Sequence, residues 1–391
     1  MEPELYPPPP ENSNAEPAPE TAPETSLAAE IFAPPKESLG MRAIRWTLFG
    51  GEGLRAGWSF LIFVLLMIVF AAPVGFVFVK THLLIPGNRS DFTPSAAFFS
   101  ELTNFLPLIG ALALMALIER RRSLLVYNLT EPRSIPHFFS GLVMGFLSLS
   151  ALVGALVWGG WLHFGPVALS GVPIYQFAAL WLLVFLTVGC VEEGIFRCYM
   201  LFTLTRGINF WWALGTVGSI CVWLVARSKG NGVWGVYGIA LLGLLPCLWL
   251  HLKKAEGAGF WQATWVTSTL FGFIHTGNGG ENWIGIFAAG FVGVVFCVSV
   301  RVTGSAWWAI GCHAAWDWAQ TYFYGTADSG MTATGHYMTC SPAGKIFWSG
   351  GADGPEGSVL VIGALLLMLA VLLAVYGRKK PVVATLERAI G

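Results

Sequence analysis

Residues 175–202 read YQFAALWLLVFLTVGCVEEGIFRCYMLF, a long apolar run that contains two glutamates and an arginine. A helix needs about 20 apolar residues to cross the hydrocarbon core of a bilayer, and this run is long enough. An ionisable side chain near the middle of a membrane costs about 2.5–3.5 kcal/mol on insertion scales, so it is expected to have a function. The run therefore predicts a transmembrane helix that carries part of a functional site.

The composition places this helix in a polytopic membrane protein. Hydrophobic residues make up 55% of the 391 residues and charged residues 11%, with a mean hydropathy of +0.65. A soluble domain carries about 25% charged residues, which excludes a water-soluble enzyme, and nothing in the charge distribution indicates binding to nucleic acid. The seven cysteines form no CxxC pair and no Cys/His metal spacing, so we expect buried thiols and no disulfide framework.

Nine further apolar runs accompany the first, and together they predict a membrane domain over residues 41–391. We expect an all-α, polytopic transmembrane helical bundle of about 8–10 spans. The ten candidate spans are residues 57–78, 98–118, 137–162, 175–202, 210–226, 233–250, 260–275, 283–300, 305–324 and 358–376.

Clusters of basic residues predict the orientation of these spans. They precede the first span and follow the even-numbered ones, as in Arg120 to Arg122 and Lys253 with Lys254. By the positive-inside rule both termini are then cytoplasmic, and Arg227 and Lys229 are the exceptions. The compact loops suggest the inner (plasma) membrane of a bacterium, with residues 325–357 as the largest outer segment.

Residues 1–40 differ from the rest of the chain. They hold eight Glu, one Lys and ten of the 22 Pro. Such a segment buries too little apolar surface to offset the entropy of ordering, so we predict a disordered, acidic, Pro-rich cytoplasmic tail. It lacks the basic region and apolar core of a signal peptide.

Ionisable residues inside the predicted spans are concentrated on three of them. With a rise of about 1.5 Å per residue, Glu192 lies about 21 Å along its helix from Arg206, and His275 about 22 Å from Phe260. The other ionisable residues of these three spans are predicted to lie at a similar depth in the membrane. Glu101, near the outer start of its own span, is predicted to be a boundary or packing residue. The six residues that share this depth are Glu192, Glu193, Arg197, His275, His313 and Asp317.

Spacing within each helix predicts separate roles. Glu193 and Arg197 are four residues apart, the favoured geometry for an ion pair. Glu192 lies about 100° further round the helix and is left free for chemistry. His313 and Asp317 are also four residues apart, which gives the imidazole a carboxyl partner. Each pair alone is equally typical of a structural ion pair or hydrogen bond.

The same residues spell three ordered motifs. Glu192-Glu193-Gly-Ile-Phe-Arg197 is EExxxR, Phe271-Gly-Phe-Ile-His275 is FxxxH, and His313-Ala-Ala-Trp-Asp317 is Hxxx(N/D). In this order, on membrane helices, they resemble the CPBP family of intramembrane glutamic endopeptidases, which includes CAAX prenyl proteases and bacteriocin-processing and immunity proteins. The resemblance covers about residues 180–323.

The resemblance implies catalytic roles for these residues. Glu192 would be the general base that activates water, and His275 would position that water. Glu193 and Arg197 would order the site, while His313 with residue 317 would stabilise the oxyanion.

Two departures from the family pattern affect this interpretation. The stretch between the first two motifs is longer than usual, and we interpret residues 210–250 as an inserted hairpin. Asp317 stands where the CAAX branch has Asn. Because an ionised Asp repels an oxyanion, Asp317 would have to be protonated or to orient His313.

The leading hypothesis is a hydrolase, an intramembrane protease that cuts a peptide or membrane-protein substrate in the cytoplasmic half of the lipid bilayer. No HExxH motif is present, which favours a reaction without a cofactor, although two His and several carboxylates leave a zinc-dependent metalloendopeptidase open. Two alternatives remain: a non-catalytic membrane scaffold or immunity protein of the same fold, and a proton-coupled transporter with a carboxylate relay. The chain shows no internal repeat, which counts against a transporter.

Overall fold

The computed structural model describes residues 38–51, 53–84, 92–227 and 233–377. The chain divides into two units between Phe49 and Gly50. Residues 1–37 of the predicted disordered tail lie outside the described residues. The predicted end of that tail at residue 40 is wrong, because helix α2 (Leu39–Leu48) begins at Leu39, where the hydroxyl of Ser38 caps it by accepting a hydrogen bond from the amide of Met41.

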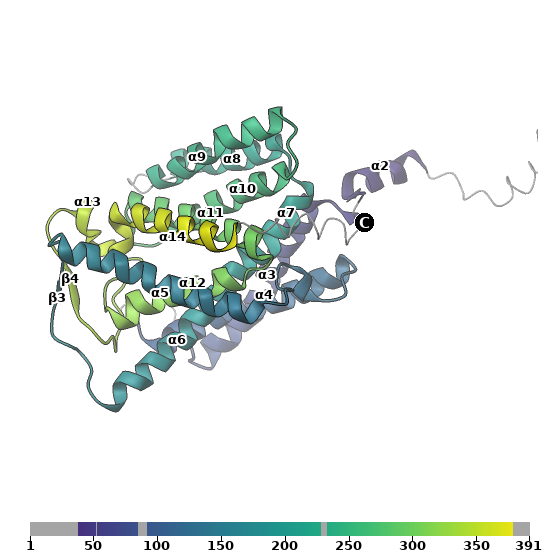
Figure 1. Ribbon diagram of the computed structural model, residues 1–391. Helices are drawn as coiled ribbons and strands as arrows, with labels where there is room; N and C mark the ends of the chain where they lie inside the picture. The colour runs from purple at the N-terminus through teal and green to yellow at the C-terminus, as the bar shows by residue number, and fades with distance from the viewer. Residues whose placement is uncertain (1–37, 52, 85–91, 228–232, 378–391) are drawn as a thin grey trace, which may run out of the picture. The chain divides into compact units, whose positions relative to one another are not determined.

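The second unit is a helical bundle, and the predicted all-α, polytopic fold is confirmed (Figure 1). Each of the ten predicted spans corresponds to a helix or a continuous helical run, and the strands are only two or three residues long. The described elements from residue 49 onward are β1 (Phe49–Gly50), β2 (Gly53–Leu54), α3 (Ala56–Lys80), α4 (Pro94–Ile118), η1 (Leu124–Val126), α5 (Ser134–Trp158), β3 (Leu162–Phe164), α6 (Val172–Glu193), η2 (Gly194–Met200), α7 (Leu201–Gly207), α8 (Phe210–Arg227), α9 (Val233–Leu252), α10 (Ala258–His275), α11 (Trp283–Thr303), α12 (Trp307–Trp318), η3 (Ala319–Phe323), β4 (Cys340–Pro342), α13 (Ile346–Ser349), η4 (Gly351–Asp353), η5 (Pro355–Gly357) and α14 (Leu360–Tyr376).

Within the described residues, six helical runs are long and apolar enough to cross a membrane: α3, α4, α5, the continuous run from α6 to α7, α9 and α11. Helices α8 and α14 are apolar but shorter. Most residues of α10 and α12 are buried by neighbouring helices, as are most residues of α11. The two helices that carry the predicted histidines are therefore inner helices of the bundle.

The predicted third span, residues 137–162, ends too late. Helix α5 stops at Trp158, and the chain turns through Gly160, which has a φ of +75° that favours glycine. Leu162 instead begins strand β3, which pairs antiparallel with β4. This pairing ties the chain after α5 to the segment 325–357, and Trp161 stacks on Trp348 with ring centroids 4.9 Å apart.

The predicted hairpin 210–250 consists of α8 and α9, which lie together at one edge of the bundle beside α10 (Figure 1). The indole Nε1 of Trp265 on α10 donates a hydrogen bond to the carbonyl of Ala240 on α9, at 2.9 Å. This peripheral position agrees with an insertion, which remains a proposal.

Helix α12 is held in place by a close contact with α5. A Cβ atom on Gly145 of α5 would overlap the carbonyl oxygen of Cys312, and one on Gly311 of α12 would overlap the carbonyl oxygen of Phe138. Glycine is needed at these positions because the two backbones touch, as small residues allow in membrane proteins. The contact sets the position of the helix that bears His313 and Asp317.

We expect Gly145→Leu to separate α5 from α12 and to destabilise the protein by about 1–3 kcal/mol, the usual cost of overpacking a core. Gly154→Leu is the matched control, because Gly154 lies on the same helix with open space around it. Thermal unfolding of both variants in detergent, followed by tryptophan fluorescence, checks this. Equal unfolding temperatures would contradict the close contact.

Candidate active site

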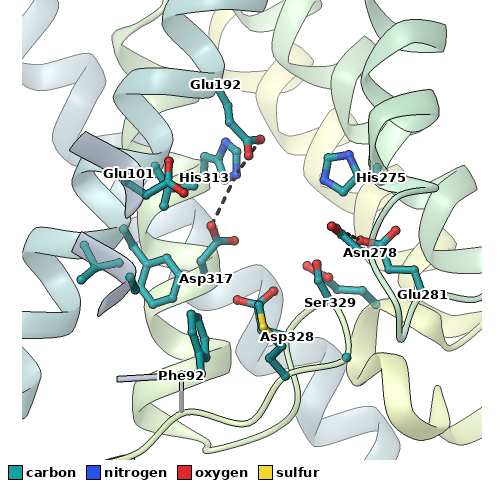
Figure 2. Close-up of a pocket in the computed structure, with 18 of the residues that line it drawn as sticks. Phe92, Glu101, Glu192, His275, Asn278, Glu281, His313, Asp317, Asp328 and Ser329 are labelled. Atoms are coloured by element: carbon teal, nitrogen blue, oxygen red, sulfur yellow. Dashed lines mark hydrogen bonds and ion pairs between the residues drawn. The ribbon is translucent and has the colours of Figure 1, made fainter. Parts of the chain in front are cut away.

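A cavity of about 1250 Å³ lies inside the bundle, and residues of all three predicted motifs line it. Its walls come from α4, α6, α10, α11, α12 and α14 and from the connections 82–84, 92–93, 277–281 and 328–331. Four of the six predicted site residues line it: Glu192, His275, His313 and Asp317. Figure 2 shows Glu192, His313 and Asp317 on one side and His275 across from them.

The other two predicted residues, Glu193 and Arg197, lie behind the cavity wall. Glu193 is 0% exposed and Arg197 1% exposed. Nη1 of Arg197 donates a hydrogen bond to Oε1 of Glu193 at 3.2 Å, and Nε lies at ion-pair distance from Oε2, 3.1 Å away. The predicted ion pair is present. The guanidinium also lies over the ring of Phe271, 4.3 Å from its centroid.

His313 connects this buried pair to the cavity. Its Nδ1 lies 2.8 Å from Oε1 of Glu193, the same oxygen that Arg197 binds. Its Nε2 points toward the cavity, 3.4 Å from Oδ2 of Asp317 and 3.8 Å from Oε2 of Glu192. Glu192, Glu193 and Asp317 therefore surround one imidazole, and α6 and α12 are joined through it.

His275 lies at the end of α10 and is oriented by its own helix. Its Nδ1 lies 2.8 Å from the carbonyl oxygen of Phe271. A carbonyl only accepts, so Nδ1 carries the proton and Nε2 of the neutral ring is left to accept a hydrogen bond. The ring of Phe271 lies between the two histidines, with centroids 4.7 Å from His275 and 6.3 Å from His313.

Both acid-bearing helices change their backbone geometry next to the site. Helix α6 ends at Glu193 and continues as the π-helical segment η2, and α12 is followed one residue after Asp317 by the π-helical segment η3. Single π-helical turns are rare and are often found at functional sites. In this structure Glu193 ends α6 and Arg197 lies within η2, and the two side chains still form their i,i+4 ion pair.

Sequence reasoning missed part of the cavity wall. Glu101, predicted to be a boundary or packing residue, also lines the cavity near His313 and Asp317 (Figure 2). The segment 325–357 contributes Asp328 and Glu356, and the turn before α11 contributes Glu281. The one feature of the sequence that could have pointed to a functional position for Glu101 is that it is an isolated carboxylate in an apolar span. No sequence feature pointed to Glu281, Asp328 or Glu356, because their positions depend on tertiary contacts.

No group of three or more His, Cys, Asp or Glu side chains within the described ranges is arranged to hold a metal ion. All seven cysteines are free, and four of them are buried. The expectation of buried thiols is confirmed for Cys198, Cys247, Cys297 and Cys312, while the other three are half-buried.

Comparison with known proteins identifies one related family. Residues 247–319 match the family model described as Type II CAAX prenyl endopeptidase Rce1-like. No curated protein and no solved structure matches the chain. The matched residues include the FxxxH and Hxxx(N/D) motifs, so the resemblance to the CAAX protease family is confirmed in this region. The long apolar helices support an integral membrane protein, and residues 247–319 are similar to a family of membrane proteases.

Glu193→Gln is expected to destabilise the protein by about 3–5 kcal/mol, because it leaves the buried guanidinium of Arg197 without its counter-charge. Glu192→Gln is the matched control: the side chain of Glu192 is 28% exposed toward the cavity and should tolerate the change. The readout is the unfolding temperature of each purified variant in detergent. Similar losses for both variants would be inconsistent with this division of roles.

The carboxylate of Asp353 links the loop 325–357 to the residue that precedes α11. Asp353 accepts a hydrogen bond from the amide of Asn282 at 3.0 Å, and Nδ2 of Asn282 donates to the carbonyl of Gly357 at 3.0 Å. Burial raises the pKa of Asp353 to about 7, against the opposing effect of the hydrogen bond from Asn282. The folded state thus holds the proton of Asp353 more tightly than the unfolded chain does.

The contribution of Asp353 to stability is full below its ordinary pKa of 3.8 and is lost as the pH rises to about 7. In Asp353→Asn this group no longer titrates, so the fall in stability between pH 4 and pH 8 should be smaller than in the wild type. The difference is about 4 kcal/mol, from a shift of about three pKa units at about 1.4 kcal/mol per unit. Unfolding temperatures across this pH range test it, and parallel pH profiles would refute it.

Proposed function

We propose that this protein is an intramembrane glutamic endopeptidase, a hydrolase that cuts a peptide bond with a water molecule activated by Glu192. One observation carries the proposal: two adjacent glutamates have opposite surroundings. Glu193 is fully buried between Arg197 and His313, whereas Glu192 faces a cavity of about 1250 Å³. A carboxylate that faces open space beside an imidazole is suited to general base catalysis.

The proposed reaction begins with a water molecule between Glu192 and the scissile carbonyl. The carboxylate takes a proton from the water as its oxygen bonds to the carbonyl carbon, which forms a tetrahedral intermediate. The protonated Glu192 then gives the same proton to the amide nitrogen as the C–N bond breaks. The products are a carboxylic acid and an amine, and Glu192 returns to its ionised form.

The two histidines supply hydrogen bonds to this reaction. Because Nε2 of His275 is left to accept, this residue can hold the water from the opposite wall of the cavity. Nε2 of His313 points into the cavity beside Glu192, where a proton on it would stabilise the oxyanion of the intermediate. Asp317 lies 3.4 Å from that nitrogen and is proposed to orient His313, which accommodates an Asp at this position.

Glu193 and Arg197 are proposed to be positioning residues. They do not line the cavity, and they act through His313, whose Nδ1 is fixed by Glu193 at 2.8 Å. A fixed donor costs no reorganisation during the reaction, which is the main advantage of a preorganised site. The substrate is a peptide or a segment of a membrane protein small enough to enter between the helices.

The membrane peptidomes of cells that carry wild type, Glu192→Gln or His313→Ala at matched expression test the proposal. New peptide termini should appear with the wild type and be reduced by about 10²–10⁴-fold in either variant, the range for loss of a general base or an oxyanion donor. Glu256→Gln, an exposed acid far from the cavity, is the control and should behave like the wild type.

Two results would contradict the proposal. Identical peptidomes from wild type and a folded Glu192→Gln protein would favour a scaffold or a transporter. Activity that is lost on chelation and restored by added zinc would replace water activation by Glu192 alone with a metal-dependent reaction.

A further inference from the structure

The two ends of the helical bundle carry different charges. Glu119 at the end of α4 lies 3.5 Å from Arg206 at the end of α7, and Arg301 at the end of α11 lies over the ring of Phe260 at the start of α10. These contacts place four helix termini at one end of the bundle, here called the basic end. The Lys and Arg residues of the connections at this end, within the described part of the chain, are Arg55, Arg120, Arg121, Arg122, Arg133, Arg206, Lys253, Lys254 and Arg301.

The opposite end, here called the acidic end, holds the strand pair β3–β4 and the clamp between Asn282 and Asp353. The Lys and Arg residues described at this end are Lys80, Arg227 and Lys345. Its described carboxylates are Glu281, Asp328, Asp353 and Glu356. The excess of Lys and Arg is thus on the basic end, and by the positive-inside rule that end is cytoplasmic.

The cavity extends to the acidic end only. The connecting segments that line it are 82–84, 92–93, 277–281 and 328–331, together with Ala352 and Glu356, and all belong to this end. Among the described residues, no connection of the basic end lines the cavity. Its deepest residues, such as Phe296 and Glu192, lie well inside the helices, so a substrate reaches them by passing the acidic end.

The entrance is rich in carboxylates. Within the described chain, the cavity wall includes Glu101, Glu281, Asp328 and Glu356 besides the proposed catalytic acids, and it includes no Lys or Arg. Oε1 of Glu281 accepts a hydrogen bond from Asn278 at 2.7 Å, while its Oε2 is shielded from solvent without a hydrogen-bond partner. A buried carboxylate oxygen in this state lacks a donor that a cationic ligand would supply.

Two of the other entrance carboxylates are held by hydrogen bonds. Asp328 accepts a hydrogen bond from Thr321 at 2.7 Å, and Glu356 accepts one from Nε1 of Trp316 at 2.8 Å. Burial raises the pKa of both Asp328 and Glu356, because water that would stabilise their ionised forms is excluded. A positively charged side chain in the cavity would supply that stabilisation.

We infer that the substrate is a positively charged polypeptide segment that enters from the non-cytoplasmic side of the membrane. This inference rests on the proposed function and names the substrate class of that same site. Exported proteins and the outer loops or termini of membrane proteins fit this description. A prenylated C-terminus on the cytoplasmic side would meet the basic end, which offers no path to the cavity.

The side of entry is tested with two single substitutions in the full chain, expressed in a Gram-negative bacterial host. Met331→Cys lies at the mouth of the cavity, 40% exposed, and Glu256→Cys lies exposed at the basic end. A membrane-impermeant maleimide should label Met331→Cys in spheroplasts and Glu256→Cys in inverted membrane vesicles, each above the wild-type background. The reverse pattern would overturn the assigned orientation.

The same two preparations are then supplied with fluorogenic peptides that do not cross membranes. One peptide carries Lys residues around the scissile bond, its partner carries Gln in their place, and a third is a farnesylated CAAX peptide. The Lys peptide should be cut in spheroplasts and not in sealed inverted vesicles, and Glu192→Gln should abolish the cleavage. Cleavage in inverted vesicles alone would overturn the inference about entry and leave the protease assignment intact.

Charge selectivity is measured as the ratio of kcat/KM for the Lys peptide to that for the Gln peptide. Glu281→Gln should lower this ratio several-fold toward one through KM, whereas Glu256→Gln should leave it unchanged. An unchanged ratio in Glu281→Gln, or a wild-type ratio near one, would overturn the role of the entrance charge. If no peptide is cut in a Glu192-dependent way in either preparation or after detergent, the proposed function itself fails.

Discussion

A buried arginine is the constraint on which the rest of this bundle depends. Arg197 lies inside an apolar protein at 1% exposure, where an uncompensated charge would cost several kcal/mol. Its charge is balanced by Glu193 on the same helical run and by the ring of Phe271 on α10. The second partner of Glu193 is His313 on α12. Three inner helices are therefore held together by one charge and its partners.

This chain of contacts also explains why the two adjacent glutamates differ. Because Glu193 is committed to Arg197 and His313, the helix presents Glu192 to the other side, where the cavity lies. A π-helical segment starts at Gly194, directly after the two glutamates, and it contains Arg197. Because Glu193 is needed to balance the charge of Arg197, Glu192 is the carboxylate that faces the cavity beside the imidazole of His313.

The cavity depends on segments that are not membrane helices. The loop 325–357 is pinned by the β3–β4 pair and by the clamp of Asn282 with Asp353, and these contacts bring Asp328 and Glu356 to its wall. Gly330 of this loop packs against Gly280 of the turn before α11, so closely that a Cβ atom on either would overlap the other backbone. An ordered loop at one end of the bundle therefore shapes the approach to residues deep in the membrane.

The sequence alone predicted the helices and the contacts within each helix, but it did not predict which helices and loops lie next to one another. The apolar runs predicted the helices, and the four-residue spacing predicted the contacts of Arg197 with Glu193 and of Asp317 with His313, because residues four apart in a helix always share a face. The three ordered motifs predicted the site residues through their resemblance to a known family. The positions of Glu101 and of the loop carboxylates and the end at which the cavity opens followed only from the packed structure. These depend on which helices become neighbours, and the 3.6-residue period of a helix gives the direction of its side chains without identifying what they meet.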